Sequence, residues 1–308
     1  IEAVMVEYIR AHYGIRKVAI VDTDCHHGDG TQDIYWHDPD TLFISIHQDG
    51  RTLYPGSGFP SEFGGPNAQG KTVNIPLPPQ TGEKGFLYAL DELVMPLLEE
   101  FGPEIVINSA GQDNHFNDPI TNMNFSARGY AILNERLKPD IAVLEGGYAI
   151  ENALPYVNVG IIMAMAGMDT SFVKEPNYEK DYRPQSRDVT LNIEELVEAL
   201  KDLFLRGGLK KKSYDEGQIL ERKRDIFYDT DGIQERQNEK IRCCSHCAGA
   251  FAISSTASTG QHIMGVHIPM EACPACRKTG LGWFVAGRKG AFRQVYLQDR
   301  DRGLYDVA

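Results

Sequence analysis

The sequence predicts an α/β fold in which helices cover both faces of a parallel sheet, followed by a small cysteine-rich domain. Short apolar runs bounded by polar or glycine-rich turns alternate with longer segments of helical periodicity. This alternation is typical of parallel α/β sheets. A cluster of cysteines near the end of the chain is the other observation, and it predicts a separate metal-binding domain.

Five apolar runs predict the strands, which are residues 18–21, 42–46, 73–77, 105–108 and 141–144. Helical patterns predict helices at residues 1–10, 84–101, 126–136, 151–167 and 192–205. Gly207-Gly208 ends the last of these. We place an α/β domain at residues 1–207, a charged linker or helix at 208–240 and a zinc ribbon domain at 241–308.

Composition and charge limit the classes of function. The 308 residues are 42% hydrophobic and carry a net charge of −12, which predicts one large and one small globular domain. An acidic body argues against broad binding to a phosphate backbone and is compatible with a cationic substrate. The last 68 residues carry eight Lys and Arg against four Asp and Glu, which is a weak indication of nucleic-acid contact.

Neither a membrane span nor a secretory leader is predicted. The apolar runs are far shorter than a bilayer requires. Residues 1–10 have the pattern of an amphipathic helix rather than of a signal peptide. We therefore expect a cytoplasmic protein. Because the chain opens with Ile1 inside that predicted helix, we expect it to be part of a longer polypeptide.

The most informative stretch follows the first predicted strand. Asp22, Asp24 and His26 leave the strand end at alternate positions, and glycines at 28 and 30 let the chain turn away. Positions two apart share a face of an extended segment, so Asp24 and His26 can converge on one cation. Oxygen and nitrogen donors of this kind suit Zn²⁺ or a similar divalent metal. The alternative is a loop in which Asp22 and Asp29 cap backbone amides.

Three further segments lie after later strands. Asp113 follows a strand end as Asp24 does, and a third ligand there would leave positions open for water and substrate. In Gly146-Gly147-Tyr148, the two glycines allow another group to approach the backbone closely. The phenol of Tyr148 can donate a hydrogen bond to a developing oxyanion. Residues 54–58, Tyr-Pro-Gly-Ser-Gly, form a glycine-rich loop. Taken singly, each segment is also compatible with an ordinary turn.

Together and in this order, these segments resemble the histone deacetylase family, which also includes bacterial acetylpolyamine amidohydrolases and acetoin-utilisation proteins. The resemblance covers roughly residues 3–170. The matching segments are Asp22-Thr-Asp24-Cys-His26-His27-Gly-Asp29-Gly-Thr-Gln32, Ile44-Ser45-Ile-His47, Tyr54-Pro-Gly-Ser-Gly58, Ser109-Ala-Gly-Gln-Asp113-Asn-His115 with Asp118-Pro119, and Leu144-Glu-Gly-Gly-Tyr148.

The resemblance implies a fold and a catalytic centre. The implied fold is the three-layer α/β arginase–deacetylase type. Asp24, His26 and Asp113 are implied to ligate the catalytic zinc. Tyr148 is implied to hydrogen-bond the scissile amide oxygen.

Further roles come from the same resemblance. Asp22 and Asp29 are implied to orient two imidazoles that handle protons. Asp22 and Ser45, with Asp24 and the carbonyl of His26, are implied to surround a structural monovalent cation, usually K⁺. Tyr54 and Gly147 are implied to line the narrow channel for the acylated side chain.

The chain departs from the family pattern in one respect. The family's proton-transfer pair is a His-His dyad upstream of this region, and nothing before Asp22 contains it, since His12 stands alone. We expect a zinc-dependent amidohydrolase that releases acetate from an acetylated amine, either acetyl-lysine or acetylpolyamine. A positioned base contributes roughly 10²–10⁴-fold, so we expect the chain to be slower by at least that factor without an N-terminal segment. The alternative is a non-catalytic zinc-binding scaffold.

A third hypothesis is an arginase-like hydrolase with two manganese ions. It requires additional bridging ligands near Asp24 and Asp113, and only His115 and Asp118 are nearby candidates. The Glu-Gly-Gly-Tyr segment does not belong to such a site.

The cysteines form a separate signal. Cys244-x-x-Cys247 and Cys273-x-x-Cys276 have the two-knuckle spacing of a zinc ribbon, and four thiolates give a closed structural zinc site. So small a segment needs its metal to fold. Cys243 is a less usual substitute for Cys244. A ribbon can dock protein or nucleic acid or form a dimer, and the sequence does not choose between these. The sequence also leaves the substrate and the oligomeric state open.

Overall fold

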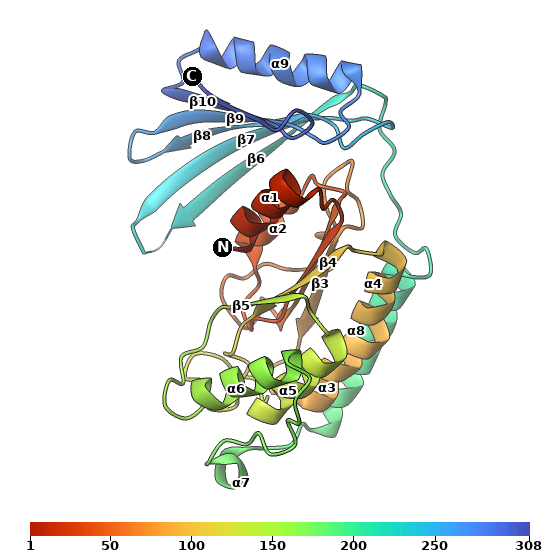
Figure 1. Ribbon diagram of the computed structural model, residues 1–308, viewed down its shortest axis with the longest axis vertical. Coiled ribbons are helices and arrows are strands. Elements are labelled where there is room, and N and C mark those ends of the chain that lie inside the picture. The colour runs from red at the N-terminus through yellow and green to blue at the C-terminus, as the bar shows by residue number, and fades with distance from the viewer. Residues whose placement is uncertain (229) are drawn as a thin grey trace. The chain divides into compact units, whose positions relative to one another are not determined.

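The computed structural model describes residues 1–228 and 230–308, which form two compact units (Figure 1). Unit 1 comprises Ile1–Trp36, Asp40–Phe63 and Gly70–Lys210. Unit 2 comprises His37–Pro39, Gly64–Gln69 and Lys211–Ala308. Each unit has its own sheet and its own hydrophobic core.

Unit 1 is built on a five-stranded parallel sheet of order β3-β2-β1-β4-β5. Its strands are β1 (Val18–Asp22), β2 (Thr41–Gln48), β3 (Thr72–Leu77), β4 (Ile105–Ala110) and β5 (Ile141–Leu144). Each strand contains one of the predicted apolar runs. Strands β1, β2 and β3 are buried along their whole length, as expected where helices cover both faces. The predicted parallel sheet is confirmed.

Helices cover both faces of this sheet and make three layers (Figure 1). One face packs against α1 and α2 around Val6, Ile20 and Phe43. The other face packs against the remaining long helices. The helices of unit 1 are α1 (Glu2–Tyr13), α2 (Asp29–Tyr35), α3 (Glu83–Ala89), the π-helical turn η1 (Leu90–Val94), α4 (Met95–Phe101), α5 (Ala127–Leu137), α6 (Leu154–Met165), α7 (Tyr178–Asp181) and α8 (Arg187–Phe204).

Local capping determines where two of these helices begin. Helix α8 starts five residues before the predicted position because the Ser186 side chain accepts a hydrogen bond from Val189 N at 3.2 Å. Ser126 caps α5 in the same way through Gly129 N. The predicted helix at 84–101 is one continuous helical stretch made of α3, η1 and α4.

Unit 2 contains a six-stranded sheet of order β11-β10-β9-β8-β7-β6, with helix α9 (Pro274–Arg288) on one face (Figure 1). Phe284 of α9 packs against Val266 and Val295 of the sheet. Strands β9 and β10 run parallel on either side of the helical connection, and the other neighbours are antiparallel. The strands are β6 (Ile219–Tyr228), β7 (Ile233–Arg242), β8 (Phe251–Ala257), β9 (His262–Ile268), β10 (Gln294–Asp299) and β11 (Leu304–Val307).

The prediction of a charged linker or helix at 208–240 was wrong for most of that stretch. Strands β6 and β7 form an antiparallel hairpin there. Exposure alternates along β6, and the half-buried positions include Leu220, Arg222 and Arg224. Arg222 lies opposite Glu239 in the ladder, and its Nε is 3.5 Å from Glu239 Oε2. Opposite charges therefore pair across the two strands. The Asp231-Gly232 pair was the overlooked signal.

Within the part of the chain that the structure describes, none of the helices combines the length and the apolar character that crossing a bilayer would demand.

Candidate metal centres

The first candidate site lies at the carboxyl edge of the unit 1 sheet. Strands β1 and β4 are adjacent and parallel, with Asp22 in register with Ser109. The segments that follow these two strands therefore leave the sheet side by side. Asp24 and His26 follow β1, and Asp113 follows β4. This edge is where ligands bind in open parallel sheets.

The three predicted ligands converge. One donor atom from each of Asp24, His26 and Asp113 lies within 4.8 Å of the others. His26 Nδ1 is 2.7 Å from Asp113 Oδ2 and 3.2 Å from Asp24 Oδ1. Burial lowers the pKa of His26, but its hydrogen bonds to Asp113 and Asp24 raise that pKa to about 10. The site therefore favours positive charge, and its two carboxylates and one imidazole fit a divalent cation.

Backbone amides hold the two carboxylates in place. Asp113 Oδ1 accepts from Cys25 N at 2.8 Å, and Asp24 Oδ1 accepts from His26 N at 2.8 Å. The second oxygen of Asp24 accepts from Gly146 N at 2.9 Å. Only one oxygen of Asp113 is used in this way, so its other oxygen is directed at His26.

The carboxylates of Asp24 and Asp113 lie close to the backbone at Gly146, as the Gly-Gly pair predicted. A Cβ at this position would lie 2.7 Å from Asp24 Oδ2 and 2.9 Å from Asp113 Oδ2. Both distances are shorter than real side chains allow, so a side chain here would displace the carboxylates. Gly147 has different neighbours, because its added Cβ would meet Leu154 and Gln112. Sequence reasoning therefore missed the role of Gly146 as a backbone donor to Asp24.

Tyr148 lies next to this group. Its ring is perpendicular to that of His26, with the two centroids 6.4 Å apart. Its backbone N–H donates to Asp118 Oδ2 at 2.9 Å, which orients the residue. Burial raises the pKa of Tyr148, and Asp113, Asp24 and Asp118 add to this effect. The phenol is about half exposed and remains protonated, so it can donate a hydrogen bond to an incoming ligand.

The other predicted residues occupy different surroundings. Asp22 is buried and lies in register with Ser45, whose hydroxyl contacts His47 Nδ1 at 2.8 Å. Burial raises the pKa of Asp22 well above its usual value, as do the neighbouring carboxylates, which a bound cation would counteract. Asp29 is exposed in the first turn of α2 and is not part of the group of three. Tyr54 is 66% exposed.

Within the residues that the structure describes, His115 and Asp118 do not reach the Asp24, His26 and Asp113 group. His115 Nε2 lies 3.3 Å from Glu175 Oε1, and both side chains are buried. Asp118 is engaged by Tyr148 N and Ile120 N. Among the described residues, neither joins the donor group around Asp24. The bridging ligands that the arginase-like hypothesis requires are therefore turned to other partners.

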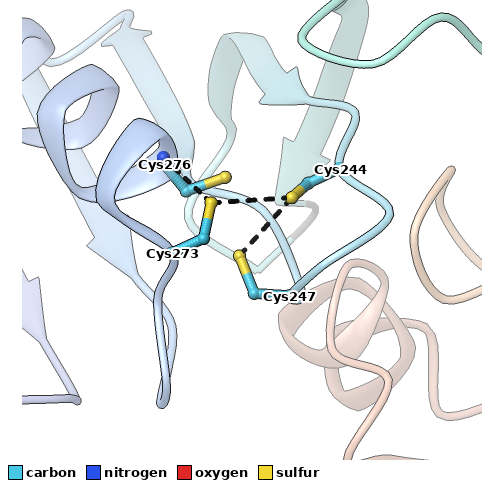
Figure 2. A group of neighbouring side chains, drawn as sticks. All are labelled: Cys244, Cys247, Cys273 and Cys276. Atoms are coloured by element: carbon cyan, nitrogen blue, oxygen red, sulfur yellow. Dashed lines mark hydrogen bonds between the residues drawn. The ribbon is translucent and has the colours of Figure 1, made fainter.

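The second candidate site is the four-cysteine group of unit 2. Cys244 and Cys247 follow β7, whereas Cys273 is the N-cap of α9 and Cys276 lies in its first turn (Figure 2). Their sulfurs all lie within 4.8 Å of one another. The sulfur of Cys244 is 3.7 Å from that of Cys247 and 3.8 Å from that of Cys273.

These separations fit a tetrahedral metal site. Zn–S bonds of about 2.3 Å place sulfurs about 3.8 Å apart at the corners of a tetrahedron. A disulfide would require about 2.05 Å, and all six cysteines are free. Cys243 is buried but lies outside the group, so Cys244 is the member of the first pair. The surrounding domain, with six strands and a helix, is larger than the ribbon we expected.

Comparison with known proteins identifies the family of unit 1. The histone deacetylase domain matches residues 2–159, which include the Asp24, His26 and Asp113 group and Tyr148. The chain belongs to the histone deacetylase family. A probable deacetylase of Archaeoglobus fulgidus is 47% identical over 209 residues, which cover 63% of this chain and 57% of that protein. Histone deacetylase 10, chloroplastic, of Oryza sativa subsp. japonica is 32% identical over 213 residues, covering 65% and 46%.

Solved structures of the deacetylase family have the same fold. The HDA15 HD domain superposes with a TM-score of 0.57 and 27% identity, covering 67% of this chain and 55% of that one. The chain spans about half the length of the curated relatives it matches. The family match ends at residue 159, so the four cysteines lie beyond it.

Proposed function

We propose that this histone deacetylase family member is a zinc-dependent amidohydrolase that releases acetate from an acetylated amine. The observation that carries the proposal is the convergence of Asp24, His26 and Asp113 beside the phenol of Tyr148. Two carboxylates and one imidazole leave coordination positions for water and substrate, as a catalytic zinc site requires. Zinc bound there would polarise the amide carbonyl and acidify a water molecule.

The chain's own residues supply the remaining functions. Tyr148 donates a hydrogen bond to the amide oxygen as negative charge develops on it, and Asp118 holds Tyr148 through its backbone. Gly146 N and Cys25 N fix the ligand carboxylates, so the site is organised before substrate binds. The net charge of −12 favours a cationic amine, whether in a lysine side chain or in a polyamine.

The general base is the open part of this proposal. Of the histidines that the structure describes in unit 1, His27 contacts Ser57 and Gln32, and His47 contacts Ser45 and Gly58. His26 belongs to the donor group, His115 contacts Asn117 N and Glu175, and His12 lies in α1. An upstream His-His dyad and impaired turnover without it therefore remain predictions. Because these imidazoles already have other partners, a second candidate function is a non-catalytic zinc-binding scaffold.

Two further ions belong to the proposal. We place a structural zinc at the four cysteines, where the sulfur separations support it. We place a monovalent cation, K⁺, near buried Asp22 and Ser45. A cytoplasmic location and docking of protein or nucleic acid through unit 2 remain predictions.

The test is acetate release from an acetyl-lysine peptide and from an acetylated polyamine. It compares the chain, an extended form that includes any residues the gene encodes before Ile1, and Tyr148→Phe in that form, with and without a chelator. We expect chelator-sensitive release by the extended form and a 10²–10³-fold lower kcat in Tyr148→Phe. Tyr156→Phe, in α6, is the matched control and should keep full activity. If the extended form binds its metal but releases no acetate, the hydrolase proposal fails and the non-catalytic scaffold is the remaining function. If Tyr148→Phe keeps full activity, Tyr148 has no part in the mechanism.

A further inference from the structure

An arginine contacts the four-cysteine group. Arg242 is the last residue of β7, two positions before Cys244, and its side chain is only 11% exposed. Its Nη1 donates to the sulfur of Cys276 at 3.3 Å. The same nitrogen lies 2.9 Å from Glu216 Oε1. Arg242 therefore joins a thiol on α9 to a carboxylate that lies outside the four cysteines.

Glu216 continues this contact to the first cysteine pair. Its other oxygen, Oε2, accepts from Ser245 N at 2.8 Å and from Ser245 Oγ at 3.0 Å. Ser245 lies between Cys244 and Cys247. The path from Cys276 through Arg242, Glu216 and Ser245 thus connects the helix that carries one cysteine pair to the loop that carries the other.

The backbone of residues 216–218 passes close to the guanidinium of Arg242. Gly217 has a φ of +82°, and a Cβ there would lie 2.9 Å from Arg242 Nη2. Gly217 N also donates to the carbonyl of Cys243 at 2.9 Å, and Cys243 N donates to the carbonyl of Gln218 at 2.8 Å. These bonds hold the segment that contains Glu216 against the end of β7. The backbone therefore keeps Glu216 within reach of the guanidinium of Arg242.

The negative charge of a four-thiolate metal site explains how the guanidinium of Arg242 can stabilise it. Four thiolates around one divalent cation carry a net charge of −2, which is costly to hold in a partly buried place. A guanidinium that donates to one sulfur lowers that cost and fixes the direction of the sulfur. The N–H groups of His246 and Cys276 also donate to sulfurs, at 3.3 and 3.4 Å, but they carry no net charge.

We propose that Arg242 and Glu216 form a brace that retains the metal at the four-cysteine site, with Arg242 as a positioning residue for Cys276. The proposal rests on the structural zinc proposed above. It implies that the guanidinium of Arg242, which is not a ligand, stabilises the metal site in addition to the four thiolates. Loss of the brace should speed metal release without removing any ligand.

The experiment measures the rate of zinc transfer from the full chain to a chromophoric chelator. It also records the thiolate-to-cobalt charge-transfer band after replacement of zinc by Co²⁺. That band reports only the four-cysteine site, because the Asp24, His26 and Asp113 group contains no sulfur. Arg242→Met should release zinc about 10–100-fold faster and shift the cobalt band, since outer-shell partners typically contribute that much. Arg242→Lys keeps the charge but not the planar guanidinium. Its rate of zinc release should therefore lie between the rates of the wild-type chain and Arg242→Met.

Arg277→Met is the matched control. Arg277 follows Cys276 directly, is 18% exposed and pairs with Asp299 and Asp301. It should release zinc at the wild-type rate. Glu216→Gln provides a second, milder test that keeps the fold, and combined with Arg242→Met it should add little, because both remove one brace.

The outcomes are separable. A wild-type chain with no thiolate-to-cobalt band would refute the four-cysteine metal site itself. A normal band with unchanged zinc release in Arg242→Met, or an equal acceleration in Arg277→Met, would refute the brace alone. If Arg242→Met does not fold, an unchanged release rate in Glu216→Gln would overturn the proposal in the same way.

Discussion

The Asp24, His26 and Asp113 group and the four-cysteine group assemble their donors in different ways. The first takes its donors from the ends of two adjacent parallel strands, β1 and β4, and lies beside a half-exposed phenol. The second takes two sulfurs from a loop and two from the N-cap and first turn of α9. Three mixed donors leave coordination positions open, whereas four thiolates close a tetrahedron.

The same difference extends to what surrounds each set of donors. Around the first group, neutral backbone amides of Cys25, His26 and Gly146 orient the carboxylates. Around the second, a guanidinium reaches a sulfur directly. The guanidinium brings a positive charge next to a sulfur, whereas the amides that orient the carboxylates carry no net charge.

Removal of one thiolate should unfold unit 2 and leave unit 1 intact. Cys273→Ala removes a ligand and the cap of α9, and structural zinc contributes about 10–16 kcal/mol in small zinc domains. Hydrogen exchange resolved by peptide should show loss of protection in β8 and β9 and unchanged protection in β1 and β4. Cys243→Ala, a neighbouring cysteine outside the group, is the control and should keep the zinc. Retained protection in Cys273→Ala would show that the unit 2 core is sufficient without metal.

Loss of one carboxylate should empty the first site without unfolding its unit. Asp113→Asn keeps the oxygen that accepts from Cys25 N but removes the charge next to His26. We expect zinc affinity to fall by more than about 100-fold, because outer-shell changes alone often cost 10–100-fold. Calorimetric titration of zinc measures this, and the cobalt–thiolate band of unit 2 should not change. Asp29→Asn, which alters an exposed carboxylate in the same motif region, should bind zinc normally. Equal affinities in the two variants would contradict the assignment of Asp113.

An added methyl group near the ligands should have the smallest effect. Gly146→Ala places a Cβ 2.7 Å from Asp24 Oδ2 and 2.9 Å from Asp113 Oδ2, so the carboxylates must shift. We expect zinc affinity at this site to fall by about 10-fold, within the range for outer-shell changes. Gly30→Ala, whose Cβ meets nothing within 4 Å, should bind zinc normally and gain stability as a helical alanine. Zinc affinity that is the same in both variants would show that the backbone at position 146 can move freely.

The sequence by itself determined the five strands of unit 1, the positions of Asp24, His26 and Asp113 after two of them, and the Cys-x-x-Cys pairs. These features follow from local rules. Apolar runs must be buried, parallel strands end at one edge, and metal ligands recur at short spacings.

Only the tertiary structure decided what those rules leave open. The charged residues of β6 were compatible with a solvated helix until pairing with β7 gave Arg222 a partner in Glu239. The need for glycine at position 146 comes from carboxylates that are far away in sequence. The contact of Arg242 with Cys276 joins residues 34 positions apart. Each of these depends on which segments become neighbours in space, and local periodicity carries no information about such distant partners.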